Sequence, residues 1–248
     1  MTVRATAWIA VVGTLACGLR ADAAAPVIAD LSEHLIAVTT GFTGTDVLLF
    51  GTANEPGDIA LVVRGPAESV TLRRKERIAG VWLNGAGATF VDVPGFYAYA
   101  GTEGVATSVP ETLMKRHQIG PENLRLEVED SDRVEAPATF RAALIEQMRI
   151  LELFPRKIEP ITVLAGQLFR ATIRFPANVP TGAYRVEILF FRDGEIVSAQ
   201  STPLTVSKIG FGADVFDFAN RYAAVYGIIA VFVAATAGWL ASVVFRKA

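Results

Sequence analysis

The stretch "TGAYRVEILFFRDGEIVSAQSTPLTV", residues 181–206, decides the fold. Two runs rich in β-branched and aromatic residues lie on either side of Asp193 and Gly194. An Asp-Gly pair between two such runs is the strongest short signal for a hairpin turn, because both positions tolerate positive φ. The stretch therefore predicts two antiparallel strands that are joined by a tight turn.

The first six residues of this stretch, "TGAYRV", place Tyr184 at the start of a strand. In immunoglobulin-like sandwiches a tyrosine at this corner hydrogen-bonds back to the backbone, two residues before a cysteine. Val186 stands at the cysteine position here, which is consistent with a sandwich that lacks the disulfide. A Gly-x-Tyr sequence can also begin an ordinary strand, so both interpretations stay open.

Further strands are predicted on both sides of a central helical region. Ile59, Leu61 and Val63 alternate with Asp58, Ala60 and Val62, a partly two-sided apolar pattern that suits one sheet packed on another. Pro56 and Gly57 form a turn before this run. Besides residues 181–206, the predicted strands are residues 34–40, 46–53, 58–65, 69–74, 80–84, 89–93 and 169–175.

The apolar period changes to that of a helix over residues 108–155. Ser108 and Glu111 match a capping box that opens the helix "ETLMKRHQ", and Gly120-Pro121 ends it. A second helix is predicted before Pro155, with one apolar face for core packing formed by Phe140, Leu144, Met148 and Leu151. We expect a helical insertion in the β domain.

The N-terminus has the features of an export signal, predicted over residues 1–23. Arg4 supplies the positive charge, residues 5–19 are apolar, and small residues precede a cleavage site near Ala23. The single cysteine, Cys17, lies inside this segment, so the mature chain is expected to hold no thiol and no disulfide. We expect residues 24–210 to form the exported, periplasmic β domain.

The C-terminus is a predicted membrane span. Residues 222–245 carry no charge and would form a helix of roughly 36 Å, which is long enough to cross the hydrocarbon of a bilayer. Arg246 and Lys247 follow, and the positive-inside rule puts the 246–248 tail in the cytoplasm. Residues 211–221 are predicted as a juxtamembrane helix, with the apolar stripe Phe211, Val215 and Phe218. The predicted location is the inner membrane.

The sequence thus predicts a mainly β protein with an immunoglobulin-like sandwich ectodomain, a helical insertion and one C-terminal transmembrane helix. The chain also resembles a family of transmembrane proteins from alphaproteobacteria that has no established activity. The resemblance lies in "GFTGTDVLLFG", "VVRGP", "RRKERIAGVWLN", "VPGFYAYA", "FPANVPTGAYRVEILFFRDG" and the final span. It implies no roles for single residues. It does imply a partnership with sulfite-exporter-like permeases, which are genome neighbours of the family.

Composition argues against several functions. The formal net charge is −2 and the isoelectric point is about 5.8, so no overall positive field attracts nucleic acid. His34 and His117 are the only histidines, and neither has a partner at metal-ligand spacing. No nucleophile elbow or phosphate-binding loop is present. We therefore expect no enzyme, no metal and no cofactor.

The stretch "RRKERIAGVWLN", residues 73–84, contains the candidate docking residues. Strand alternation puts Arg73, Lys75 and Arg77 on one face and Arg74 on the other. Trp82 follows them. Three interpretations remain open: a solvated strand end that pairs with acidic residues of the chain, a surface for a partner or anionic headgroups, and a small-anion site. The acidic residues are Glu127, Glu129, Asp130, Asp132 and Glu135.

The membrane helix has one face of small residues, which would let a neighbouring helix approach closely. An alanine-rich segment can also form such a face by chance. The residues are Gly227, Ala230, Ala234, Ala237, Gly238 and Ala241. The sequence favours a non-enzymatic, membrane-anchored accessory or interaction protein, with a permease as the expected partner. The alternatives are a periplasmic module that binds a small oxyanion and an enzyme with an unrecognised site.

Overall fold

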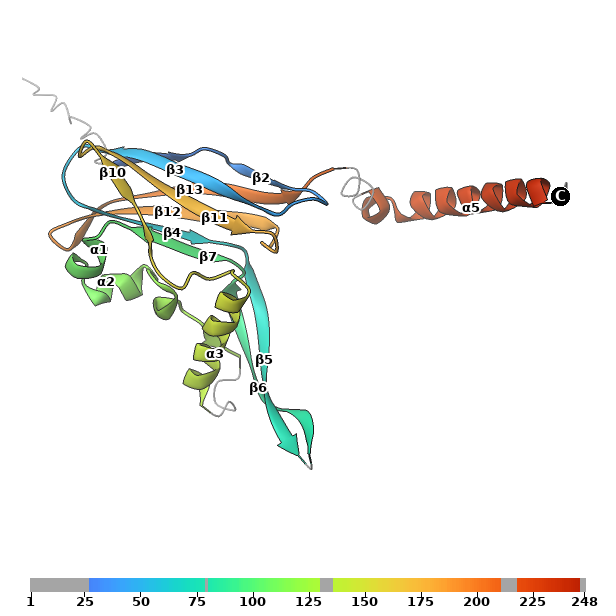
Figure 1. Ribbon diagram of the computed structural model, residues 1–248, viewed down its shortest axis with the longest axis horizontal. Helices are drawn as coiled ribbons and strands as arrows, with labels where there is room; N and C mark the ends of the chain where they lie inside the picture. Colours follow the sequence, from blue (N-terminus) through green and yellow to red (C-terminus); the bar gives the residue numbers. More distant parts are fainter. Residues whose placement is uncertain (1–26, 79, 130–135, 211–217, 246–248) are drawn as a thin grey trace, which may run out of the picture.

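The structure, a computed structural model, describes residues 27–78, 80–129, 136–210 and 218–245. The predicted export signal and cytoplasmic tail lie outside these residues, and so do Asp130, Asp132 and Glu135. The described part is mainly β, as predicted, with two sheets stacked against each other (Figure 1). We call them sheet A and sheet B.

Sheet A has four strands in the order β1, β3, β11 and β10, and all its neighbours are antiparallel. Its strands are β1 (Val27–Leu31), β3 (Gly44–Ala53), β11 (Leu168–Pro176) and β10 (Thr162–Leu164). Sheet B has six strands in the order β2, β13, β12, β4, β7 and β9. They are β2 (Leu35–Val38), β13 (Glu195–Lys208), β12 (Gly182–Arg192), β4 (Asp58–Arg64), β7 (Tyr97–Gly101) and β9 (Glu159–Pro160).

The predicted hairpin is confirmed, and it consists of β12 and β13. Arg192 pairs with Glu195, so Asp193 and Gly194 alone form the turn. Both have positive φ, at 50° and 77°, which is the conformation that two-residue hairpins need. The two strands stay paired back to Gly182 and Val206, with one irregularity after Phe190.

Tyr184 makes the backbone hydrogen bond that its position in "TGAYRV" predicts. Its hydroxyl donates to the carbonyl oxygen of Pro180 at 2.6 Å. The ring lies 5.9 Å from the rings of Phe96 and Phe175, so it joins the two sheets in one aromatic cluster. The immunoglobulin-like topology is a more specific assignment than a mainly β fold, and it stays a prediction.

β4 is buried on both of its faces. Its five central residues, Ile59–Val63 in the sequence, are each 1% exposed or less. Sheet A covers one face, and a layer of short helices lies along the other side of β4 and β7 (Figure 1). The layer consists of α1 (Val105–Ser108), α2 (Glu111–Arg116) and the 3-10 turn η1 (Pro121–Asn123), whereas α3 (Pro137–Ile150) runs beside the projecting hairpin of residues 67–94 (Figure 1).

The helical insertion was predicted in outline, with errors at its ends. Phe140, Leu144 and Met148 are buried on α3 as expected, but Leu151 is 42% exposed because α3 ends at Ile150. The capping box is wrong, because α2 begins after Pro110 with no side-chain cap. The Ser108 hydroxyl instead donates to Asp58 Oδ2 at 2.5 Å and to the Gly104 carbonyl at 2.7 Å.

A third sheet projects from the body as a long hairpin. It consists of β5 (Ala67–Ile78), β6 (Val81–Pro94) and β8 (Glu127–Val128), in the order β5, β6, β8. We call the β5–β6 pair the arm. Residues 80–84 and 89–93 were predicted as separate strands, but both belong to the single strand β6 because one continuous ladder with β5 holds them together.

The C-terminal helix is α5 (Ala223–Phe245), within one residue of the prediction. Its segment Ala223–Ser242 is the one candidate membrane span in the described residues, with a mean hydropathy of 2.0 and no part buried against the protein. A length of 20 residues suffices to cross a bilayer. Of the predicted juxtamembrane helix, Phe218–Arg221 in the sequence are helical, and the rest lies outside the described residues.

We expect Tyr184→Phe to lower the free energy of unfolding by about 1 kcal/mol, because the half-buried carbonyl of Pro180 loses its donor. Urea unfolding of the full chain in detergent, followed by circular dichroism, measures this. Tyr99→Phe is the matched control, since Tyr99 is half-buried and its hydroxyl has no hydrogen bond within the described residues. Equal losses in both variants would contradict a stabilising role for the corner.

Candidate functional site

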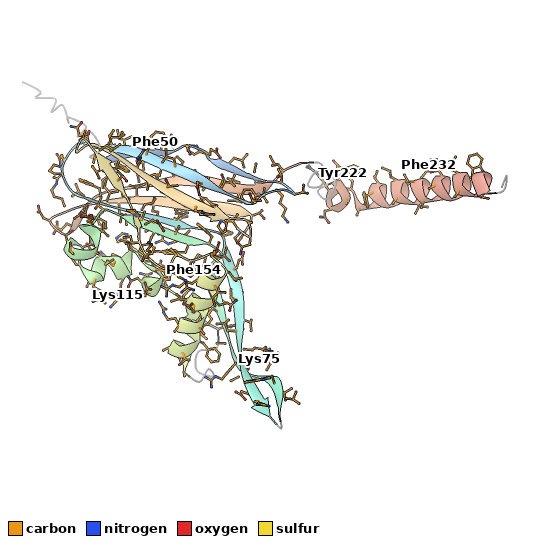
Figure 2. The ribbon with its side chains drawn as sticks, in the orientation of Figure 1. Phe50, Lys75, Lys115, Phe154, Tyr222 and Phe232 are labelled. Atoms are coloured by element: carbon orange, nitrogen blue, oxygen red, sulfur yellow. The ribbon has the colours of Figure 1, made fainter. Side chains whose placement is uncertain are left out.

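The arm is fixed at its base and free at its tip. At the base, Ala88, Phe90 and Val93 of β6 are at most 2% exposed, and β8 pairs with Phe90 and Val91. Toward the tip, the side chains of β5 and β6 lose these contacts, and Figure 2 shows Lys75 on the projecting part. The core therefore sets the direction of the arm and leaves its end accessible.

The register of the arm gathers four of the five predicted docking residues. Arg77 pairs with Trp82 and Lys75 pairs with Asn84, and directly paired residues share one face of a hairpin. Alternation along β5 adds Arg73 to the same face. We call Arg73, Lys75, Arg77 and Trp82 the docking face.

Arg74 is separated from the docking face. Its guanidinium lies 5.5 Å from the ring centre of Phe140 on α3, within the range of a cation–π contact. The alternation of exposure agrees, because Leu72 and Glu76 are half-buried while Arg73, Lys75 and Arg77 are exposed. Arg74 is exposed as well, but it lies on the face of the arm that is turned toward α3, and its part in docking stays a prediction.

Two glycines shape the middle of the arm. The register shifts between Arg73 and Lys75, opposite the segment that contains Gly85 and Gly87. A Cβ atom at Gly85 would lie 2.3 Å from Glu76 Cδ, and one at Gly87 would lie 2.9 Å from the Leu72 carbonyl oxygen. Gly87 is thus needed for a close approach of two backbones at an irregular ladder position, whereas the atom that meets Gly85 is the end of a side chain that can move. The sequence "NGAGAT" is explained by this irregularity.

The tip of the arm combines cations with exposed apolar side chains. Val81 is 60% exposed, Trp82 64% and Leu83 47%. Within the described ranges, no carboxylate lies at ion-pair distance from Arg73, Lys75 or Arg77. Glu127 and Glu129 lie at the base, where β8 and the Glu129 amide bond to β6. Sequence reasoning missed Val81 and Leu83, although they flank Trp82 directly.

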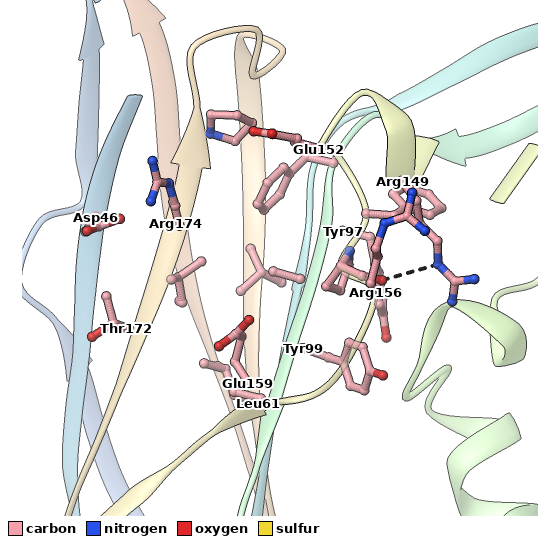
Figure 3. A pocket seen from close by; sticks show the side chains of 18 of the residues that line it. Asp46, Leu61, Tyr97, Tyr99, Arg149, Glu152, Arg156, Glu159, Thr172 and Arg174 are labelled. Atoms are coloured by element: carbon pink, nitrogen blue, oxygen red, sulfur yellow. Dashed lines mark hydrogen bonds between the residues drawn. The ribbon is translucent and has the colours of Figure 1, made fainter. Parts of the chain in front are cut away.

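A cleft of about 830 Å³ opens between the two sheets beside α3 (Figure 3). Its floor is apolar, and three arginines and three carboxylates surround it. Two of the arginines have partners: Arg149 bonds to Glu122 at 2.5 Å and Arg156 to Glu146 at 3.0 Å. Arg174 is the cross-strand neighbour of Asp46. The guanidinium groups of Arg149 and Arg156 are therefore engaged within the protein.

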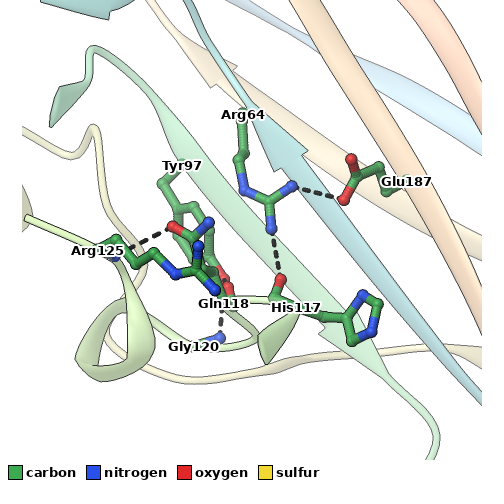
Figure 4. A network of polar contacts seen from close by, with 7 residues as sticks. All are labelled: Arg64, Tyr97, His117, Gln118, Gly120, Arg125 and Glu187. Atoms are coloured by element: carbon green, nitrogen blue, oxygen red, sulfur yellow. Dashed lines mark hydrogen bonds and ion pairs between the residues drawn. The ribbon is translucent and has the colours of Figure 1, made fainter. Parts of the chain in front are cut away.

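A second cleft, of about 640 Å³, lies at the end of β4 and carries three guanidinium groups, those of Arg64, Arg125 and Arg185. Asp92 and Glu127 also line it. Arg64 is held from both sides: Nη1 donates to Glu187 Oε2 at 2.6 Å and Nη2 to the His117 carbonyl at 2.5 Å (Figure 4). Its Nε atom is buried and has no partner among the described residues.

Tyr97 fixes the loop that follows α2. Its hydroxyl donates to the Gln118 carbonyl at 2.7 Å and accepts from the Gly120 amide at 2.8 Å (Figure 4). Gln118 and Gly120 both have positive φ, so the loop turns sharply at these residues. Burial raises the pKa of Tyr97 well above its ordinary value of 10.0. Tyr97 and Arg64 together attach the helical layer to sheet B.

The two histidines take structural positions. His34 Nε2 lies 3.0 Å from Asp30 Oδ1, and both side chains are exposed. His117 follows α2 directly, and burial lowers the pKa of its imidazole. In the described part of the chain, no group of three His, Cys, Asp or Glu side chains could hold a metal ion.

The small-residue face of α5 is exposed along its whole length. Gly227 also lines a shallow groove of about 490 Å³ together with Val231 and Phe232, and Figure 2 marks Phe232 on this helix. Packing of this face against a partner stays a prediction. The face consists of Gly227, Ala230, Ala234, Ala237, Gly238 and Ala241.

Residues 26–247 match a protein family described as "Putative transmembrane protein (Alph_Pro_TM)". The chain belongs to this family. The match covers both the β domain and α5, which confirms the resemblance seen in the sequence and agrees with the apolar length of α5. No curated protein matches the chain.

We expect the charge reversal Arg73→Glu, Lys75→Glu and Arg77→Glu to change the free energy of unfolding by no more than about 1 kcal/mol, because exposed charges contribute little to stability. Arg64→Met is the contrasting variant, with an expected loss of about 3 kcal/mol, since it leaves Glu187 and the His117 carbonyl without their donor. Urea unfolding measures both. A similar loss in both variants would show that the cations of the arm are structural.

Alkaline pH is expected to destabilise the fold. Unfolded tyrosines ionise near pH 10, whereas burial raises the pKa of Tyr97 and Tyr184 in the folded state. Above about pH 10 the unfolded chain therefore binds fewer protons than the folded chain, so stability falls as the pH rises. Urea midpoints between about pH 8 and 11 should show the fall, and Tyr97→Phe should make it shallower. An unchanged slope in this variant would contradict the assignment to Tyr97.

Proposed function

We propose that this protein is a non-enzymatic accessory subunit, anchored in the inner membrane, whose periplasmic β domain docks a partner membrane protein through the tip of the arm. The observation that supports the proposal most is the docking face itself. Trp82 is 64% exposed and lies opposite Arg77, with Lys75 and Arg73 behind it. Tryptophan and arginine are enriched among the residues that dominate protein interfaces.

The orientation in the membrane follows from the two ends of the sequence. An export signal over residues 1–23 carries the β domain into the periplasm. Arg246 and Lys247 then hold the C-terminus in the cytoplasm. The two features agree on one orientation, a single span with its N-terminal domain outside the cytoplasm.

The polar groups of the domain support a binding role over a catalytic one. Arg64 joins Glu187 and the His117 carbonyl, Tyr97 holds the Gln118–Gly120 backbone, and Asp58 accepts from Ser108. Each of these contacts ties one element of the fold to another. The cations of the docking face, by contrast, make no ion pair within the described residues, and their one side-chain hydrogen bond there is a long one, from Arg77 Nε to the Gly80 carbonyl at 3.4 Å in the same hairpin. This suits a surface that recognises something outside the chain.

The expected partner is a sulfite-exporter-like permease, from the genome neighbourhood that the family resemblance implies. The chemistry of the docking face requires that the partner present an acidic surface with an apolar pocket for Trp82. The small-residue face of α5, from Gly227 to Ala241, would pack beside a helix of the same permease. Two contacts at once, one in the membrane and one outside, would define the position of the subunit.

The alternative of small-oxyanion binding is supported by the second cleft better than by the arm. Arg64, Arg125 and Arg185 line that cleft, and Arg64 Nε is buried without a partner among the described residues. Guanidinium groups in a cleft bind planar or tetrahedral oxyanions through paired hydrogen bonds. The cations of the arm lie instead on an exposed face of a hairpin, which does not surround an anion with hydrogen-bond donors.

We expect a permease to co-purify with the full-length protein in a mild detergent, and to be lost when the arm is changed. Arg73→Glu, Lys75→Glu, Arg77→Glu and Trp82→Ala together should lower its recovery at least about tenfold, which corresponds to about 1.4 kcal/mol. Quantitative mass spectrometry measures the recovery. The matched control reverses three exposed cations away from the arm: Arg116, Lys157 and Lys208.

Two results would contradict the proposal. One is recovery of the chain alone, and the other is recovery of a membrane protein that the arm variant and the control retain equally. If titration of the protein with sulfite, sulfate or phosphate also releases heat that Arg125→Gln abolishes, oxyanion binding in the second cleft replaces docking as the function.

A further inference from the structure

The outer face of sheet A is exposed and apolar although it lies on a folded domain. Ile28, Leu48, Phe50, Leu164 and Leu168 are all between 38% and 60% exposed. They come from all four strands, and Figure 2 shows Phe50 at the edge of the sandwich away from the helices. Polar residues share this face with them: Asp30, Asp46, Thr52, Thr162, Arg170, Thr172 and Arg174. Exposed large apolar side chains gathered on one face of a folded domain mark an interaction surface.

The register places four of these residues in two adjacent rows across the sheet, and Leu48 lies in the next row beside Thr172. In the first row, Ile28 lies beside Thr52, then Leu168 and Leu164. The second row runs in the order Asp30, Phe50, Arg170 and Thr162. Phe50 on β3 thus has an acid on one side and a base on the other, each one strand away, about 4.8 Å.

This arrangement is self-complementary. If two copies of the sheet pack face to face about a two-fold axis that runs along β3, each residue on β1 meets a residue on β11 of the other copy. Asp30 then faces Arg170, and Ile28 faces Leu168. Phe50 and Thr52 lie on the axis and meet their own counterparts. In these two rows apolar groups on β1 and β11 meet each other and opposite charges meet, as an isologous interface requires. Asp46, on the same face of β3, would meet its own counterpart, with the cross-strand neighbour Arg174 of each copy beside it.

We propose that the outer face of sheet A is the surface through which two copies of this chain associate. This goes beyond the proposed function, because it uses a sheet to which the arm does not belong. The matching of charges across the axis selects a second copy as the occupant. A partner with a different sequence would need a base, an aromatic residue and an acid opposite Asp30, Phe50 and Arg170 in turn.

The size of the face predicts a weak contact that the membrane anchor strengthens. The strands β1, β3, β11 and β10 have 5, 10, 9 and 3 residues, and at about 3.4 Å by 4.8 Å per residue they cover roughly 440 Å² per copy. Stable interfaces bury about 800 Å² per partner. Anchoring by α5 confines two copies to one plane and raises their effective concentration, which offsets the small area.

Cross-linking of the full chain in native membranes tests the proposal. Thr52→Cys places a thiol on the axis and keeps the apolar residues, and Cys17→Ala removes the native thiol. Stacked sheets lie about 10 Å apart and disulfides need Cα atoms within about 7 Å, so a short bis-maleimide is the suitable reagent. We expect at least about five times more cross-linked dimer than with Thr205→Cys, an exposed threonine on sheet B.

Charge exchange tests the pairing itself. Asp30→Arg or Arg170→Asp alone should reduce the cross-linked dimer about tenfold, and the two together should restore it. Asp30 and Arg170 of one copy are two strands apart, about 10 Å, where salt screens their interaction. Restoration therefore reports contact between copies. Unfolding curves of each variant check that the fold is intact.

The proposal is overturned if Thr52→Cys and Thr205→Cys cross-link equally, or if the double exchange fails to restore a dimer that the single changes remove. An unchanged dimer in both single-charge variants also overturns it, since association would then occur through α5. None of these outcomes depends on the arm or on a permease, so the result is separate from that of the co-purification experiment.

Discussion

Burial of β4 on both faces is the constraint on which the rest of the domain depends. A strand that is apolar on both sides needs a cover on each, and sheet A supplies only one of them. The helical insertion supplies the other cover. Arg64 at the end of β4 holds that layer in place by its bonds to Glu187 and to the His117 carbonyl. Arg64 thus directly follows the residues of β4 that are buried on both faces.

The same constraint positions the arm. Only two residues separate Arg64 from the start of β5. The Gly65 amide donates to the Phe96 carbonyl, and the Pro66 carbonyl accepts from the Gly95 amide, beyond the other end of the arm. Both ends of the arm are therefore attached to the core at its base by backbone hydrogen bonds. Arg74 adds a contact with Phe140 on α3. The docking face is carried outward by a rigid pair of strands, so it can lose its cations without loss of the fold.

Local signals were enough to predict some elements from the sequence, and long-range contacts decided the others. Asp193-Gly194 and the uncharged length of α5 need no distant partner, so both were predicted correctly. The capping box failed because Ser108 bonds to Asp58, fifty residues away in the sequence. β6 was divided in two because Gly85 and Gly87 are typical of loops, and only the ladder with β5 makes them part of a strand. Strand alternation in the sequence was enough to predict that Arg73, Lys75 and Arg77 share one face. That Trp82 lies on the same face follows from its pairing with Arg77, which no local sequence pattern specifies.

The two proposed surfaces are compatible because they lie on different sheets. Sheet A would bring two copies together about an axis along β3, while each arm projects from the far end of β4 and stays free. A pair of copies then presents two arms that are fixed to one membrane plane by two α5 helices. Two weak contacts in one assembly bind far more tightly than one, provided that the partner offers two matching sites. A small docking face of three cations and one tryptophan is sufficient under that condition, and it favours a partner that is itself a symmetric dimer or contains an internal repeat.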